Sequence, residues 1–226
     1  MPRLSIIIPT MNEERSIGLV IDTVKKSLSN AISYEILTVD TNSKDKTREI
    51  ATAKGARVID EPRRGYGRAY KTGFEQASGE IIATLDADMT YPAERIEQLV
   101  NMLDSEKLDF ITTNRLDEME HGAMSFTHRF GNRMLNIAVR LLFRVKIRDS
   151  QSGMWVFRKN VLPRLDLTSD GMSLSEEIKV EAFRKSKAKE VPIKYSPRVG
   201  EVKLNTWRDG IQNLKFLFKK RFGRAH

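Results

Sequence analysis

Residues 81–88, Ile-Ile-Ala-Thr-Leu-Asp-Ala-Asp, are a short apolar run that ends in two carboxylates. A run of this length is typical of a buried strand. Pro92 follows, and then come apolar residues at helical spacing, namely Ile96, Leu99, Val100 and Leu103. Because proline is tolerated in the first turn of a helix, this pattern predicts strand, loop and helix in succession. Asp86 and Asp88 are therefore expected at the carboxyl end of a strand.

The same succession occurs earlier in the chain. Residues 4–8 form an apolar run that stops at Pro9, and residues 17–28 have helical spacing. A second strand is predicted at 35–39, a second helix at 45–54 and a third strand at 57–59. Strands that alternate with helices imply an α/β fold with a parallel sheet. We expect one such domain over residues 1–204 and an amphipathic basic helix over 205–226.

Composition narrows the classes of protein that this chain can belong to. With no Cys among 226 residues, it has neither disulfides nor thiolate metal sites. No apolar stretch approaches the roughly 20 residues that cross a bilayer, and Met1 leads straight into a strand-like segment. A cytoplasmic location is expected. The formal charge of +9 favours an anionic partner.

The carboxylates of Asp86 and Asp88 suit a hard divalent cation. Side chains at i and i+2 of an extended segment point the same way, so both can reach one ion. Mg²⁺ or Mn²⁺ is expected there, because such ions keep several waters and take substrate phosphates as further ligands. The alternative interpretation is that the two acids serve a turn and a helix cap.

Four ordered segments carry a resemblance to a known family: Pro9–Glu13, Asp40–Thr47, Gly65–Gly73 and Asp86–Asp88. Together they resemble glycosyltransferase family 2 with the GT-A fold, and most of all its dolichyl-phosphate and polyprenyl-phosphate sugar synthases. The resemblance implies a Rossmann-like, mostly parallel sheet flanked by helices, with amphipathic basic helices in the C-terminal half.

The resemblance also implies roles for individual residues on the donor side. Asp86 and Asp88 would bind the metal that bridges the donor diphosphate, and Asp88 and Lys71 would act in catalysis. The residues implied in nucleotide-sugar binding are Pro9, Asn12, Glu13, Asp40, Lys71, Asp86, Ala87, Asp88, Arg198 and Lys203. The chain departs from the family pattern at Met11, Thr41, Asn42, Lys46 and Thr90. Thr90 stands where relatives often place a stronger metal ligand.

On the acceptor side, the resemblance assigns a lipid phosphate to Arg115, Arg129 and Arg133, with Arg115 and Arg129 catalytic. The planar fork of arginine suits phosphate, although Arg129 and Arg133 would also fit the solvated stripe of an ordinary helix. A phosphate monoester is largely ionised at neutral pH, so such an acceptor needs no general base. Glu176 and Glu177 are the candidate bases for a hydroxyl acceptor.

The implied reaction is inverting transfer of a hexose from a nucleotide sugar, with GDP-mannose favoured, to polyprenyl or dolichyl phosphate. UDP-glucose or UDP-GlcNAc as donor and a hydroxyl acceptor are the alternatives, and a sugar nucleotidyltransferase is a different class. Residues 126–147 and 206–222 mix basic and apolar side chains, which suits peripheral attachment at the inner face of the membrane. A separate membrane subunit is a further partner that the resemblance allows, whereas nucleic acid is not expected.

Overall fold

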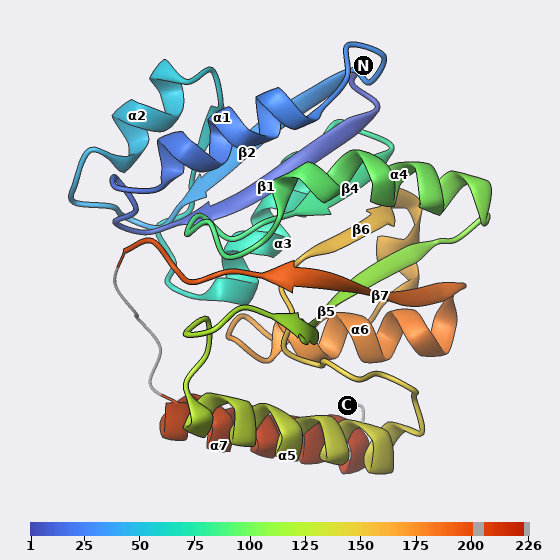
Figure 1. The fold of residues 1–226 in the computed structure, drawn as a ribbon. Coiled ribbons are helices and arrows are strands. Elements are labelled where there is room, and N and C mark those ends of the chain that lie inside the picture. The colour runs from blue at the N-terminus through green and yellow to red at the C-terminus, as the bar shows by residue number, and fades with distance from the viewer. Residues whose placement is uncertain (201–205, 224–226) are drawn as a thin grey trace.

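A computed structural model describes residues 1–200 and 206–223, and within them seven strands form a single sheet (Figure 1). The strands lie in the order β3-β2-β1-β4-β6-β5-β7, and β6 alone runs against its neighbours in the described residues. The strands are β1 (Leu4–Thr10), β2 (Tyr34–Asp40), β3 (Arg57–Asp60), β4 (Ile81–Thr84), β5 (Phe110–Met119), β6 (Trp155–Arg158) and β7 (Ala188–Tyr195). The predicted α/β fold with a mostly parallel sheet is confirmed.

Helices cover both faces of the sheet because successive residues of a buried strand point to opposite faces. Ile6 and Ile8 of β1 face a core shared with α1 (Ile17–Ser27), α2 (Thr47–Ala53) and α4 (Ile96–Ser105). Ile7 faces a second core, shared with α3 (Tyr66–Gln76) and α6 (Leu174–Lys185). Two 3₁₀ segments, Ala93–Arg95 and Lys159–Arg164, complete the body.

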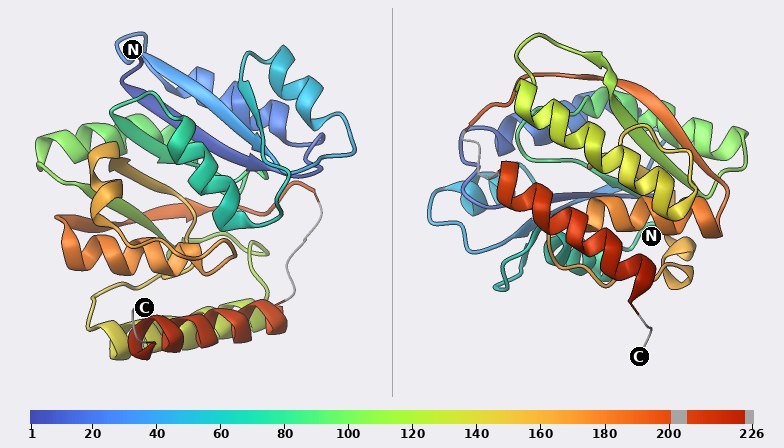
Figure 2. Two further views of the ribbon diagram at one scale, coloured as in Figure 1. Left: turned by 180° about the vertical axis from the view of Figure 1, so that it is seen from behind. Right: turned by 90° about the horizontal axis from the view of Figure 1, so that it is seen from below.

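A third layer lies beneath α6 and consists of α5 (Phe126–Phe143) and α7 (Thr206–Phe222). The right view of Figure 2 shows the two helices side by side and parallel. Leu135, Val139 and Phe143 of α5 are buried with Leu217 of α7 and Val180 of α6. The helix predicted in the C-terminal tail is thus confirmed, while the division of the chain between residues 204 and 205 stays a prediction.

The basic amphipathic segment predicted at 126–147 is helical only as far as Phe143. Arg144 adopts a left-handed conformation with φ of 57° and ends the helix. From there, buried Val145 and Ile147 alternate with exposed Lys146 and Arg148, which is the period of an extended chain. The helix stops because the next two apolar residues are buried at a spacing of two.

The sheet presents a row of strained loops where its parallel strands end. Asn12 after β1, Asn42 after β2 and Met89 after β4 all have positive φ, at 54°, 60° and 67°. Residues other than glycine rarely adopt this conformation, and it is least expected of a long side chain such as methionine. Such strain gathers at ligand sites, so this edge of the sheet is the first place to look for one.

Candidate functional site

Asp86 and Asp88 leave β4 at the carboxyl edge of the sheet, as the sequence predicts. The Oδ1 atom of Asp86 accepts hydrogen bonds from the hydroxyl groups of Tyr66 and Tyr70, each at 3.4 Å. Burial, and then the negative charge of Asp88, raise the pKa of Asp86 to about 7. The two carboxylates therefore form a crowded acidic pair that a nearby cation would stabilise.

Arg198, which lies beyond the edge strand β7, supplies a positive charge to this pair. It follows β7, and its Nε and Nη2 atoms lie 2.8 and 2.5 Å from Oδ2 of Asp88. The backbone N–H of Val199 donates to the carbonyl of Asp88 at 2.9 Å, which fixes the segment in place. Arg198, expected to bind the nucleotide sugar, is thus held at the predicted metal ligand Asp88.

The residues present fit a divalent cation that is shared with substrate. Asp86 and Asp88 are the carboxylates that would hold it, and the described residues contain no group of three or more histidines and acids able to form a closed metal site. Water and donor phosphates would therefore supply the remaining ligands, as is usual for Mg²⁺. Thr90 donates its Oγ1 hydroxyl to Oδ1 of Asp88 at 2.6 Å, so it orients that carboxylate.

The loops after β1 and β2 are joined at the edge where the donor nucleotide is predicted. Asp40 is fully buried and accepts hydrogen bonds from Thr10 Oγ1 at 3.1 Å and from the N–H of Ser43 at 3.1 Å. Asn12 Oδ1 accepts from the N–H of Lys44 at 2.7 Å, and Ser43 Oγ accepts from the N–H of Asn12 at 2.8 Å. Asn12 and Asp40 are therefore brought together in one rigid corner.

The five other predicted donor residues have less direct placements. Pro9 lies within β1, and the backbone N–H of Glu13 donates to Thr47 Oγ1 at 2.7 Å, so both belong to the same corner. Lys71 on α3 pairs with Asp170 at 2.5 Å. Ala87 is buried between the two acids, and Lys203 lies outside the described residues. The donor roles of these residues stay predictions.

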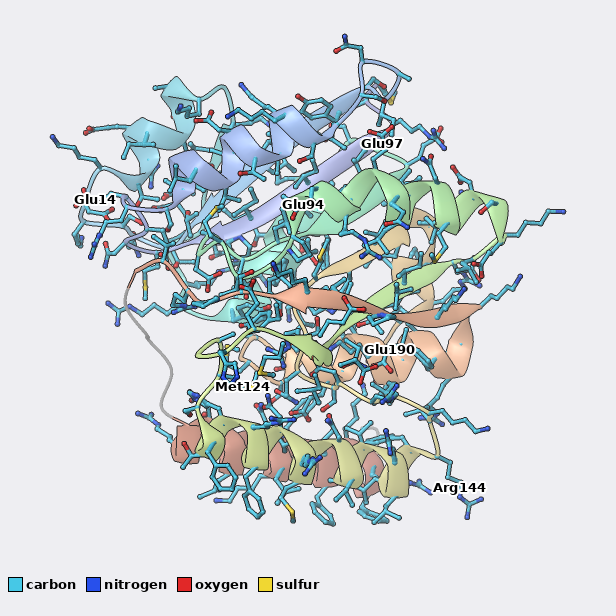
Figure 3. All side chains as sticks on the ribbon, viewed as in Figure 1. Glu14, Glu94, Glu97, Met124, Arg144 and Glu190 are labelled. Atoms are coloured by element: carbon cyan, nitrogen blue, oxygen red, sulfur yellow. The ribbon has the colours of Figure 1, made fainter. Side chains whose placement is uncertain are left out.

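A pocket of about 200 Å³ extends from Asp86 to the layer formed by α5 and α7. Figure 3 shows Met124, one of its lining residues, between the start of α5 and the sheet. Near the sheet the pocket is lined by Tyr66, Asp86, Thr90, Tyr91, Arg115, Gln151, Tyr195 and Arg198. Near the helices it is lined by Ala123, Met124, His128, Gly131, Asn132, Leu135, Met172, Asp209, Gly210 and Asn213.

Arg115 lies in the wall of this pocket and is held by a buried carboxylate. Its Nε and Nη2 atoms donate to the two oxygens of Asp149 at 2.8 and 2.9 Å, and its guanidinium lies 5.2 Å from the ring centre of Tyr195. Burial opposes ionisation of Asp149, yet the charge and hydrogen bonds of Arg115 lower the pKa of Asp149 to about 2. A rigid, fully charged guanidinium is thus presented at the pocket.

Arg129 and Arg133 are exposed on a different side of α5 from the pocket wall. In the pairs His128-Arg129 and Asn132-Arg133, the first member of each pair lines the pocket. Because residues four apart share a helix face, His128 and Asn132 point to one side and the two arginines to another. Their predicted part in binding acceptor phosphate remains untested.

Three features lie at one edge of the sheet. They are the joined loops after β1 and β2, the acidic pair of Asp86 and Asp88, and the pocket with Arg115 in its wall. The sequence profile described as Glycosyl transferase family 2 matches residues 5–165 of this chain. The chain belongs to that family. This confirms the resemblance seen in the four loop segments, and the protein is a glycosyltransferase.

Two curated relatives of this family 2 glycosyltransferase come from the archaeon Haloferax volcanii. It is 37% identical over 219 residues to the low-salt glycan biosynthesis hexosyltransferase Agl6 of Haloferax volcanii, covering 96% of this chain but 53% of that protein. It is 30% identical to the dolichyl-phosphate hexose transferase of the same organism, over 92% of this chain and 89% of that protein. The chain thus spans about half the length of the first relative and most of the second.

Solved structures agree with the fold of the transferase. Glucosyl-3-phosphoglycerate synthase of Mycobacterium tuberculosis, in complex with Mn²⁺, UDP and glucosyl-3-phosphoglycerate, superposes with a TM-score of 0.79 at 20% identity. The match covers 100% of this chain and 81% of that one. The same synthase with Mg²⁺ and UDP gives a TM-score of 0.76. The GT-A architecture is therefore confirmed.

Several residues that line the pocket of the transferase were not predicted from the sequence. Tyr91 and Tyr195 lie far apart in the sequence, yet their rings meet at 5.3 Å between centres beside Arg115. Asn213 of α7 donates to Gln151 Oε1 at 3.2 Å and accepts from Ser173 Oγ at 2.8 Å. No local pattern marks these residues, because their shared location comes from the crossing of distant elements.

The two candidate bases, Glu176 and Glu177, are absent from the described lining of the pocket. Glu177 accepts hydrogen bonds from Thr168 and Ser169 and pairs with Lys220 at 2.9 Å. Glu176 lies behind Gln151, from which it accepts a hydrogen bond at 2.7 Å, and burial raises the pKa of Glu176 to about 8. Glu177 is therefore engaged within the protein, whereas Oε2 of Glu176 is buried with no hydrogen-bond partner among the described residues.

Proposed function

We propose that this transferase moves a hexose from a nucleotide sugar, with GDP-mannose favoured, to polyprenyl or dolichyl phosphate. The observation that carries the proposal is the pocket itself, which has Asp86 of the acidic pair and Arg115 at one end and two amphipathic helices at the other. A diphosphate donor suits the first end. An acceptor with a phosphate head and a hydrocarbon chain suits the whole length.

The names of two relatives support this choice of acceptor. One is the dolichyl-phosphate hexose transferase of Haloferax volcanii, and another is the dolichol-phosphate mannosyltransferase of Pyrococcus furiosus, 28% identical over 89% of this chain. UDP in the solved structures keeps UDP-glucose as the alternative donor. Mg²⁺ or Mn²⁺ is the proposed cofactor, since both occur in those structures.

Each residue group has a distinct part in the proposed reaction. An acceptor phosphate oxygen attacks the anomeric carbon of the donor, and the bond from that carbon to the diphosphate breaks, which inverts the configuration. A divalent ion between Asp86 and Asp88 would stabilise the charge of the departing diphosphate. Arg115 orients the acceptor phosphate, which is already ionised and needs no base. Lys71 and Arg198 are the further cations proposed to face the diphosphate.

A transfer assay tests the proposal directly. The purified protein would be given polyprenyl phosphate, Mn²⁺ and radiolabelled GDP-mannose or UDP-glucose in parallel. We expect a charged, lipid-linked sugar phosphate that is lost when EDTA removes the metal. Transfer to diacylglycerol or to a free sugar, with lipid phosphate ignored, would overturn the choice of acceptor.

Arg115→Lys gives a sharper result in the same assay. Lysine keeps the positive charge but lacks the fork that makes two hydrogen bonds at once. Losing one charge-assisted hydrogen bond, worth about 1.5–3 kcal/mol, should lower kcat/KM for the lipid phosphate by about tenfold or more. Donor affinity, measured by thermal shift with Mn²⁺, should not change. Equal losses for donor and acceptor would show that Arg115 has only a structural part.

The outer face of the α5–α7 layer is the proposed membrane contact. None of the helices in the described part of the chain is both long and apolar enough to cross a bilayer. The exposed apolar residues on this face are Phe126, Phe130, Met134, Ile137, Leu141, Ile211, Leu214, Phe218 and Phe222. The exposed basic residues beside them include Arg129, Arg133, Arg140, Arg208, Lys215 and Lys219. This combination matches an anionic lipid surface.

Flotation with vesicles tests the membrane contact. Vesicles of phosphatidylglycerol with phosphatidylcholine should carry the wild-type protein upward, and phosphatidylcholine alone should do so less. Phe126 and Leu141 are 83% and 75% exposed, so replacing both by Asn should leave the fold intact. At about 1.5 kcal/mol or more for each buried apolar side chain, each loss should weaken partitioning about tenfold.

Leu19→Asn is the matched control for this experiment, because Leu19 is an equally large apolar residue, 52% exposed, on α1 of the opposite layer. The control should float like the wild type. If the Phe126 and Leu141 variant also floats normally, the outer face is not the membrane contact. Arg129 and Arg133 lie on this face, where they would attract the lipid phosphate before it enters the pocket.

A further inference from the structure

A second hollow, the basic cleft, lies at the C-terminal end of α5 and shares no lining residue with the pocket beside Asp86. It has a volume of about 820 Å³. Its lining residues are Arg140, Arg144, Val145, Lys146, Arg148, Phe183, Ala188, Lys189 and Glu190. In Figure 3, Arg144 lies at the end of α5, and Glu190 lies toward the sheet. Five of the lining residues are basic and one is acidic, so the cleft favours an anion.

The chain builds the basic cleft by ending α5 with an arginine. Arg144 has φ of 57°, a conformation in which glycine is the usual residue at a helix end. The extended segment that follows exposes Lys146 and Arg148 on one side. Arg140 donates its Nε to the carbonyl of Ile147 at 2.7 Å, which holds this segment against the helix. What an arginine supplies at position 144, and glycine would lack, is a guanidinium at the cleft.

Two cations of the basic cleft are available to an outside anion. Arg144 and Lys146 are exposed and form no ion pair with any residue in 1–200 or 206–223. Arg148 pairs with Asp117 at 2.8 Å. The acid of the cleft, Glu190, accepts the backbone N–H of Arg148 at 3.0 Å, so its carboxylate is engaged by the backbone. The positive charge of Arg144 and Lys146 is therefore not balanced within the described protein.

The basic cleft borders the outer face of the α5–α7 layer. Leu141, which is 75% exposed on that face, stands between Arg140 and Arg144 in the sequence. Ile137, one turn earlier, is 50% exposed. Inside the cleft, Phe183 adds half-buried apolar surface beside the cations. A ligand that has both a negative charge and hydrocarbon next to it fits this surface better than a free anion does.

We propose that the basic cleft binds the phosphate headgroup of an anionic phospholipid. Arg144 would bind the phosphate through its planar fork, Lys146 would add charge, and Phe183 would pack against the start of the hydrocarbon chains. This inference rests on the membrane contact proposed above, and not on the choice of donor or acceptor. It adds a headgroup site to a contact that is otherwise made by apolar side chains and diffuse charge.

Removing the two free cations tests the proposal. Arg144→Gly with Lys146→Gln, the cleft pair, would be compared in flotation with Lys215→Gln and Lys219→Gln, which remove two exposed charges from α7. On vesicles of phosphatidylglycerol with phosphatidylcholine, each lost charge of the α7 pair should weaken partitioning about fivefold. The cleft pair should lose about tenfold more than the α7 pair, the factor expected for one charge-assisted hydrogen bond. On phosphatidylcholine alone, both pairs should float like the wild type.

The stability of Arg144→Gly separates loss of binding from loss of folding. Glycine adopts a positive φ without steric cost and is the usual residue at this kind of helix end. The thermal midpoint of the single variant should therefore equal or exceed that of the wild type. Weaker flotation together with an unchanged or higher midpoint identifies the guanidinium as a ligand group.

A soluble probe distinguishes a phospholipid from free phosphate. Calorimetry would use dihexanoyl phosphatidylglycerol below its micelle concentration and, in parallel, inorganic phosphate. We expect the short-chain lipid to bind the wild type and to bind the cleft pair at least about tenfold more weakly. Equal affinity for inorganic phosphate would overturn the phospholipid as the ligand.

Flotation also shows which of the two proposals fails. A cleft pair that floats like the α7 pair would overturn the headgroup site alone, provided that the wild type floats. A wild type that floats on neither kind of vesicle would overturn the membrane contact, and the headgroup site with it.

Discussion

Asp88→Asn is expected to abolish sugar transfer, with a loss of at least about a thousandfold, because a bridging metal contributes several kcal/mol to the stability of a departing diphosphate. The amide keeps the size of the side chain and can still accept from Thr90. It cannot balance the charge of Arg198 or bind a divalent ion strongly. Asp86→Asn should cause a loss of the same order.

The loss in these variants should appear in binding as well as in turnover. Titration of Mn²⁺ in the presence of UDP or GDP, followed by calorimetry, should show weaker metal binding. The donor should no longer raise the thermal midpoint in the presence of Mn²⁺. Asp22→Asn, which removes an exposed carboxylate paired with Lys54 at 2.5 Å, should behave as the wild type in both measurements. Full turnover by either site variant would refute the metal role of this pair.

Asp149→Ala is expected to lower the free energy of unfolding by about 3–5 kcal/mol, because it leaves Arg115 as a buried charge without its carboxylate. Asp149 is fully buried and Arg115 is 7% exposed. The measurement is equilibrium unfolding in urea. Asp117→Asn is the matched control, since its ion pair with Arg148 is largely exposed, and it should cost about 1 kcal/mol or less.

The pH dependence of stability gives a second measurement on Asp149. Its pKa is lowered from 3.8 to about 2 in the folded protein. An acid whose folded pKa is depressed stabilises the fold above its unfolded pKa, and this contribution is lost as the pH falls through the folded value. The wild type should therefore lose this contribution between about pH 4 and 2, and the Ala variant should not. Parallel acid unfolding curves would contradict the proposed ion pair.

The loop around Asp149 connects the pocket beside Asp86 to the layer formed by α5 and α7. Asn136 of α5 accepts hydrogen bonds from the N–H and the Oγ of Ser150, both at 2.7 Å. Glu190 of β7 accepts from the N–H of Asp149 at 2.9 Å. The position of Arg115 therefore depends on α5 and β7 as well as on its own strand.

Local sequence patterns were sufficient for the first half of the fold. The apolar runs at residues 4–8, 35–39 and 81–85 become β1, β2 and β4, because their side chains have partners on both faces of a sheet. In a parallel sheet the carboxyl ends of these strands meet at one edge. The location of Asp86 and Asp88 at that edge therefore follows from strand order and direction alone.

The second half shows where local patterns mislead. Ser173 and Glu176 have the spacing of a helix cap, yet the side chain of Ser173 forms no cap hydrogen bond and donates to Asn213 of α7. A contact between residues forty positions apart outweighs the local one. The arginines of α5 look equivalent in the sequence, yet helical geometry exposes Arg129 and Arg133 while His128 and Asn132 face the pocket.

The sequence by itself determined the α/β class, the family and the acidic pair, since each depends on residues that are neighbours along one strand and its loop. Tertiary structure alone decided that Arg198 binds Asp88, that Asp149 holds Arg115, and that α5 lies against α7. Those contacts join segments far apart in the chain. Their energy comes from burying charge and apolar surface together, which no local pattern of residues encodes.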